Sequence, residues 1–141
     1  MKKLFLLLFL FLQLFLQAQN VKRYLYKGFV DSRPVTLYLK SEDNQCTAEL
    51  NYSGMYKYDK VSNWLQLEIT KNDKNQFILV EYSFTGALIL SKQKDVFSGI
   101  WISPDSKKQL KVEFKLQNLT AAEAKSYDDK YDQMNYENND C

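Results

Sequence analysis

Two glutamates, Glu68 and Glu81, are the carboxylates best placed for chemistry, because a glycosidase needs one carboxyl group as acid and a second as base or nucleophile. Glu68 alternates with apolar residues, so it belongs to the water-facing side of a predicted strand and the pair is not expected to work together. Glu81 shares its face with Phe77 and Leu79, and a buried carboxylate needs a partner. We therefore expect Glu81 to bond to a Lys, Arg or Tyr side chain, with a ligand or partner contact as the alternative.

Other side chains that support catalysis are scarce. The chain has no histidine, which excludes imidazole general bases, Ser-His triads and His-ligated zinc. Its two cysteines are too few for a zinc site made of cysteine alone, and its four glycines form no phosphate-binding loop. The sequence therefore predicts that the protein is not an enzyme and uses no cofactor or metal.

Aromatic side chains are the more abundant candidates for binding, with ten Tyr and two Trp in the chain. Tyr24 and Tyr26 share one face of a predicted strand, as do Tyr56 and Tyr58. Their rings either pack half-buried with the hydroxyl group reaching water, or line a ligand or protein surface. Trp101 is interpreted as part of a closing hairpin, with binding as the alternative. The candidate binding residues are Tyr24, Tyr26, Tyr56, Tyr58, Glu81 and Trp101.

The two cysteines, Cys46 and Cys141, are candidates for a disulfide bond in an oxidising compartment. A bridge between them would attach the C-terminal tail to the rest of the domain. Closing so long a loop stabilises a fold by up to roughly 4–5 kcal/mol in the chain-entropy model. The alternatives are a free thiol and a link to a second chain.

The N-terminus has the pattern of a secretory signal peptide, residues 1–18. Lys2 and Lys3 precede an apolar run from Leu4 to Leu16, which is shorter than the roughly 20 residues that span a bilayer. Cleavage is expected after Ala18, and a retained N-terminal anchor is the alternative. The sequence thus predicts a periplasmic or extracellular protein with no stable membrane span after cleavage.

The charge of the chain argues against a nucleic-acid partner. The formal net charge is +2, and it falls to 0 when Lys2 and Lys3 are removed with the signal peptide. Residues 120–141 carry six acidic and two basic side chains and form an acidic tail. A nucleic-acid binder has a strongly basic, clustered surface, which this composition does not provide.

Short segments of period two, separated by turn-forming residues, predict an all-β antiparallel protein. The predicted strands span residues 22–30, 34–40, 45–52, 54–59, 63–70, 76–84, 86–93, 96–103 and 108–117. Eight or nine strands with short connections favour an up-and-down meander that closes into a small barrel, because closure removes the exposed edges. A two-sheet sandwich is the alternative.

The barrel domain is expected to span residues 19–119, and residues 120–141 to form a short helix and an acidic polar tail. Thr120 and Glu123 form a capping box that predicts a helix over residues 121–132, followed by a frayed Asn-rich end. Residues 77–82 and 96–102 are apolar on both faces of their strands. We therefore expect the barrel interior on one side of them, and the helix or another segment on the other.

Several motifs recur in a fixed order along the chain. They are Gly28, Val35–Leu39, the G-x-Y-x-Y motif of Gly54–Tyr58, Leu65–Leu67, Leu79–Glu81, and the F-x-G-x-W-x-S-P-D motif of Phe97–Asp105. This order resembles a group of small exported bacterial proteins, found especially in the Bacteroidetes and largely uncharacterised, over roughly residues 24–117. The turn in that group usually reads Asp-Gly, where this chain has Asp105 and Ser106. The resemblance implies a β-rich fold and export, and it implies no activity.

The sequence leaves two binding functions open. The leading hypothesis is a non-catalytic exported binding module that engages a protein partner or acts as an envelope accessory factor. The alternative is a carrier of a small ligand, with a barrel cavity lined by Tyr and Trp. A carrier requires a wide interior, whereas a protein binder requires a filled interior and an outward aromatic patch.

Overall fold

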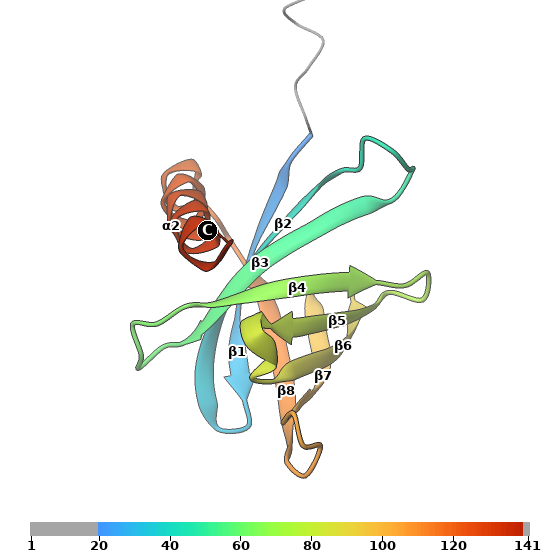
Figure 1. Ribbon diagram of the computed structural model, residues 1–141, viewed down its shortest axis with the longest axis vertical. Helices are drawn as coiled ribbons and strands as arrows, with labels where there is room; N and C mark the ends of the chain where they lie inside the picture. The colour runs from blue at the N-terminus through green and yellow to red at the C-terminus, as the bar shows by residue number, and fades with distance from the viewer. Residues whose placement is uncertain (1–19, 140–141) are drawn as a thin grey trace, which may run out of the picture.

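The computed structural model describes residues 20–139, in which eight antiparallel strands form a closed barrel and one helix lies against its outside (Figure 1). Each strand pairs with the next along the chain, and β8 pairs with β1 to close the barrel. The prediction of a closed meander is confirmed. The elements are β1 (Lys22–Val30), β2 (Arg33–Asp43), β3 (Leu50–Tyr58), β4 (Leu65–Lys71), β5 (Gln76–Glu81), η1 (Tyr82–Phe84), β6 (Ala87–Gln93), β7 (Val96–Ile102), β8 (Gln109–Gln117) and α2 (Ala121–Asn139).

The predicted strands 45–52 and 54–59 are in fact one strand, β3, which continues through Gly54. A methyl group on Gly54 would lie 2.5 Å from the carbonyl oxygen of Tyr38 and 2.7 Å from Leu39 Cδ2. The glycine therefore lets β3 lie close against β2, and it does not end the strand. Residues 44–49 form a loop in place of the predicted strand start, and Asn44 Oδ1 accepts a hydrogen bond from the amide of Cys46.

The barrel interior is filled by side chains from all eight strands. Its core includes Tyr26, Leu37, Tyr56, Leu79, Leu88, Phe97, Val112 and Phe114, each at most 1% exposed. Eight-stranded barrels are narrow enough for large side chains to meet across the axis. The alternation predicted for β4 and β8 is confirmed on this inner face, because Leu67, Val112 and Phe114 are buried there.

The F-x-G-x-W motif lies on β7, with Phe97 and Trp101 both directed into the core. A methyl group on Gly99, between them, would lie 2.0 Å from the carbonyl oxygen of Ile89 on β6. No other residue fits without moving one of these strands. The motif therefore serves close strand packing, as the interpretation of a closing hairpin requires.

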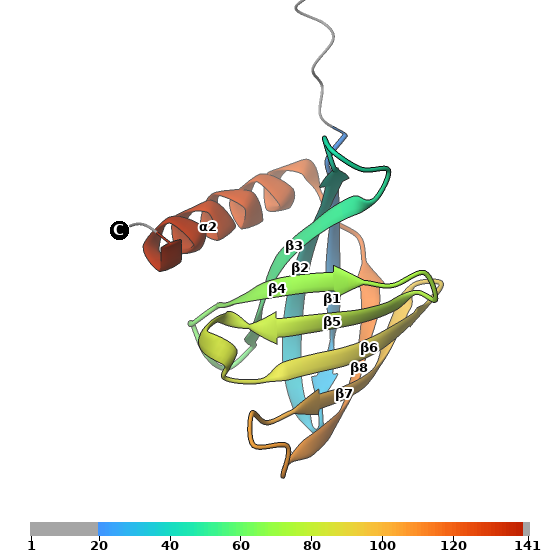
Figure 2. The same ribbon diagram turned by 45° about the vertical axis from the view of Figure 1, so that its right-hand side comes forward.

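The helix α2 covers the outer face of β2–β4. Of the two covers predicted for the doubly apolar strands, the helix or another segment, the helix is therefore wrong. Figures 1 and 2 show α2 beside β2 and β3, with β5–β7 turned away from it. Tyr38, Met55 and Gln66 form a cross-strand row beneath the helix. Tyr38 and Met55 pack against Met134 of α2 and form a second apolar cluster, outside the barrel core. The partly buried residues of this cluster are Trp64, Leu119, Tyr127 and Tyr131.

The predicted capping box begins α2. The Glu123 amide donates to Thr120 Oγ1 at 3.2 Å, and the Thr120 amide donates to Glu123 Oε2 at 2.9 Å. The helix is longer than the predicted 121–132, because its barrel-facing side continues through Met134 and Asn138. None of the helical segments described is long and apolar enough to cross a membrane.

Candidate functional site

Glu81 lies at the centre of a polar cluster inside one end of the barrel, which we call the Glu81 end. Its side chain is only 4% exposed. The hydroxyl of Tyr56 donates to Oε1, and Trp101 Nε1 donates to the same oxygen at 2.6 Å. Thr85 Oγ1 donates to Oε2 at 2.6 Å. Donors thus satisfy both carboxylate oxygens, as a buried carboxylate requires.

The surroundings of Glu81 hold Tyr56 in its protonated form. Burial raises the pKa of the Tyr56 hydroxyl well above its usual value, and the hydrogen bond to Glu81 raises it further. The ring of Tyr58 meets that of Tyr56 edge-on with 5.8 Å between centroids, and the Arg33 guanidinium lies 4.7 Å from the Tyr58 centroid. These contacts give the side chains at the Glu81 end partners within the barrel.

Four of the six predicted binding residues therefore meet at the Glu81 end: Tyr56, Tyr58, Glu81 and Trp101. Of the Lys, Arg or Tyr partners that the sequence predicts for Glu81, the structure supplies a Tyr. Glu68, the other carboxylate considered for catalysis, is exposed and pairs in register with Val80 on the outer face. It does not join the cluster, and the arrangement around Glu81 holds the barrel end together.

Tyr24 and Tyr26 lie at the opposite end of the barrel, around a pocket of about 170 Å³. We call this pocket the lysine cup. It is lined by Tyr24, Tyr26, Leu39, Tyr52, Lys71, Asn75, Phe77, Lys92 and Phe97. Below it the barrel core is closed, because Tyr26 meets the Phe97 ring with 4.9 Å between centroids. The cup is therefore a shallow opening above a filled interior.

Both lysines of the cup lie over aromatic rings. Lys92 Nζ is 5.6 Å from the Tyr24 centroid and 6.0 Å from the Phe97 centroid. Lys71 Nζ is 6.0 Å from the Phe77 centroid. Such contacts hold an ammonium group near the inner wall and leave its remaining donors available.

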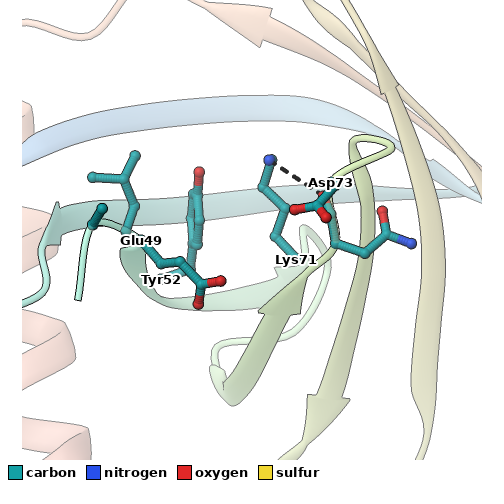
Figure 3. Close-up of a pocket in the computed structure, with 7 residues that line it drawn as sticks. Glu49, Tyr52, Lys71 and Asp73 are labelled. Carbon is teal, nitrogen blue, oxygen red and sulfur yellow. Dashed lines mark hydrogen bonds between the residues drawn. The ribbon is translucent and has the colours of Figure 1, made fainter.

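A second pocket, of about 230 Å³, adjoins the lysine cup and shares Tyr52 and Lys71 with it. Figure 3 shows the Tyr52 hydroxyl and the Lys71 amine directed to the same side of this pocket. Glu49 from the β2–β3 loop and Asp73 from the β4–β5 turn also line it. This outer pocket is thus the more polar of the two, and the apolar rings belong to the cup.

The outer surface of β5–β7 carries two cross-strand rows of aliphatic side chains, which we call the aliphatic face. One row is Ile78, Ile89 and Ile100, and the other is Val80, Ala87 and Ile102. Ile78 is 48% exposed and Ile89 is 45% exposed. The first row ends beside Thr70 of β4 and Lys111 of β8, which give it a polar rim.

Sequence reasoning missed Lys71, Lys92 and Thr85. The two lysines follow Ile69 and Leu90 at the spacing of inward-facing residues, so each is a cation on the dry side of its strand. That break in the alternation was a usable signal. Thr85 carried no signal, because it reaches Glu81 only through the turn that follows β5.

Some predictions fall outside the described residues. The signal peptide, residues 1–18, and Cys141 lie there, so export and the disulfide bond stay predictions. Cys46 is exposed on the β2–β3 loop. Within residues 20–139, no three cysteine, aspartate or glutamate side chains converge as a metal site would require.

Comparison of the chain with protein-family models, curated proteins and solved structures finds no match in any of the three. The resemblance to small exported bacterial proteins therefore stays a prediction. Function has to be inferred from the chemistry of the Glu81 cluster, the lysine cup and the aliphatic face.

Proposed function

We propose that this chain is a non-catalytic exported binding module that engages a protein partner through the aliphatic face. The observation that carries the proposal is the unbroken row of Ile78, Ile89 and Ile100 on the outside of the barrel. No other segment of residues 20–139 covers it, since α2 packs over β2–β4. Contiguous apolar patches with a polar rim are typical of protein interaction sites.

The alternative of a carrier with an internal cavity has less support. Tyr26, Tyr56, Phe97 and Phe114 occupy the barrel axis and are each at most 1% exposed. A carrier of a drug-sized ligand uses a pocket of roughly 300–1,000 Å³. The filled interior favours recognition by the outer surface.

Catalysis also has little support from the geometry. Tyr56, Trp101 and Thr85 already occupy the oxygens of Glu81, the most deeply buried carboxylate described. A general acid or base must reach the substrate directly or through one water molecule. An accessory role in the cell envelope, with a partner that presents an apolar surface, agrees with the signal peptide that the sequence predicts.

The test compares the wild-type protein with Ile89→Asp in affinity isolation from the cells that produce it. Phe29→Asp is the matched control, because Phe29 is also an exposed apolar residue on the barrel exterior, but it lies on β1. We expect one partner to be retained by the wild type and by Phe29→Asp and lost by Ile89→Asp. Equal retention by all three would contradict the proposal, and so would an assembly made only of copies of this chain.

A further inference from the structure

The lysine cup holds two positive charges that have no carboxylate partner among the described residues. The ion pairs in residues 20–139 involve other cations: Arg23, Lys40, Lys107 and Lys125. Within the described part of the chain, Lys71 Nζ donates only a long hydrogen bond, 3.4 Å, to the carbonyl oxygen of Asn72. Lys92 contacts aromatic rings. Both ammonium groups thus keep free N–H donors, from which an anion can accept hydrogen bonds.

The wall around these charges is aromatic. The Phe77 and Phe97 rings meet edge-on with 5.0 Å between centroids, and the Tyr52 ring meets Phe77 with 5.4 Å between centroids. The volume of about 170 Å³ is close to that of apolar cavities of roughly 150 Å³ that hold one benzene molecule. The cup therefore has space for one ring or a short acyl chain.

A buried hydroxyl near the cup also lacks a partner. Ser41 is 2% exposed, and its Oγ makes no hydrogen bond within the described residues. It lies two residues beyond Leu39 on the same face of β2, and Leu39 lines the cup. Buried polar atoms are normally satisfied, so this face still has the capacity for one hydrogen bond.

We propose that the lysine cup binds a small monoanion with a flat apolar body, such as an aromatic carboxylate. Lys71 and Lys92 hold the carboxylate, and the ring lies among the aromatic side chains of the wall. This site is separate from the aliphatic face, on a different surface of the barrel.

Neighbouring acidic residues restrict the charge of the ligand. Glu49 and Asp73 line the adjoining pocket, and Asp95 is exposed in the turn between β6 and β7. Burial, together with charges that include that of Asp95, raises the pKa of Tyr26 at the base of the cup. These carboxylates would repel a polyanion more strongly than a ligand with a single negative charge.

The experiment titrates the purified protein with benzoate, with benzyl alcohol and with acetate, and follows binding by NMR chemical shifts. Benzyl alcohol keeps the ring without the charge, and acetate keeps the charge without the ring. The variants are Lys71→Gln and Lys92→Gln. Lys111→Gln is the matched control, because Lys111 is an exposed lysine on the outer face of β8.

We expect benzoate to shift resonances of Tyr24, Tyr52 and Phe77, and each cup variant to weaken its binding about tenfold, the effect of losing one charged hydrogen bond. Lys111→Gln should bind as the wild type does, and benzyl alcohol and acetate should bind far more weakly. Equal binding of benzoate and benzyl alcohol would overturn the assignment of an anion. Shifts confined to another surface, or no shifts at millimolar benzoate, would overturn the site itself.

Discussion

Trp101 Nε1 on β7 donates a 2.6 Å hydrogen bond to Glu81 Oε1 at the end of β5. The bond joins two strands that are not neighbours in the barrel, because β6 lies between them. It therefore ties the side chains at the Glu81 end across the interior. Trp101 and Glu81, two of the candidate binding residues, thus hold this end of the barrel together.

Replacing Tyr56 with Phe removes one donor from Glu81 and keeps the ring. Glu81 is 4% exposed, so water does not readily replace the lost hydroxyl. We expect the free energy of unfolding to fall by about 1–3 kcal/mol, measured by urea denaturation. Tyr24→Phe is the control, because the Tyr24 hydroxyl makes no hydrogen bond to the described residues, and it should change stability little. Equal free energies of unfolding for the two variants would show that the hydrogen bond from Tyr56 to Glu81 does not stabilise the fold.

Alkaline pH should destabilise the fold through its buried tyrosines. Burial raises the pKa of Tyr26 and of Tyr56 above the ordinary value of 10.0. The unfolded chain then loses these protons first, so their contribution to stability is complete below pH 10 and is lost as the pH rises above it. We expect the urea midpoint to fall above about pH 10, with a smaller slope in Tyr56→Phe. Parallel pH profiles for the two proteins would contradict this cause.

Asp128 attaches α2 to the barrel. It accepts hydrogen bonds from Arg23 Nε at 2.6 Å and from the Tyr38 hydroxyl at 2.8 Å. Burial alone would raise the pKa of Asp128, but these hydrogen bonds outweigh it and hold the pKa below the usual range.

We expect Asp128→Asn to cost about 1–2 kcal/mol and to speed hydrogen exchange in α2 more than in the strands. Asp129→Asn is the control, because among the described residues Asp129 pairs only with exposed Lys125 on the same helix. Its cost should be about 0.3–0.5 kcal/mol. Unchanged protection of α2 in Asp128→Asn would exclude this attachment.

Ser106 occupies a backbone conformation that favours glycine. Its φ is 57°, in the turn between β7 and β8. Ser106→Gly should raise the free energy of unfolding by about 0.5–1 kcal/mol, since it removes the strain of a Cβ in the left-handed region. Ser106→Ala keeps the Cβ and should give no such gain. A lower urea midpoint for the glycine variant would refute the expectation.

The barrel was predictable because most of its strands can be recognised from the alternation of apolar and polar residues within a single segment. The alternation of Leu110, Val112 and Phe114 with charged residues is a property of β8 alone, and closure follows from the number of strands. The position of α2 was not predictable in this way. It depends on Tyr38, Met55 and Gln66, which come from three strands and form one row only after the barrel closes.

The two candidate sites also differ in how far the sequence predicts them. Glu81 was identifiable from its apolar neighbours on β5, and a Lys, Arg or Tyr partner was expected. The lysine cup needed the register of strands that are distant in sequence, because Lys71 and Lys92 reach one pocket from β4 and β6. Single-strand patterns do not show which inward-facing residues share a barrel end.

The most direct test of the proposed function is site-specific photo-crosslinking in the producing cells. A benzophenone amino acid replaces Ile89 in one protein and Phe29 in another, so that each probe sits on a different side of the barrel. We predict a single adduct to a second protein from position 89, absent from position 29 and abolished when Ile78→Asp is added. Adducts of equal yield from both positions, or none from position 89, would contradict a partner-binding role for the aliphatic face.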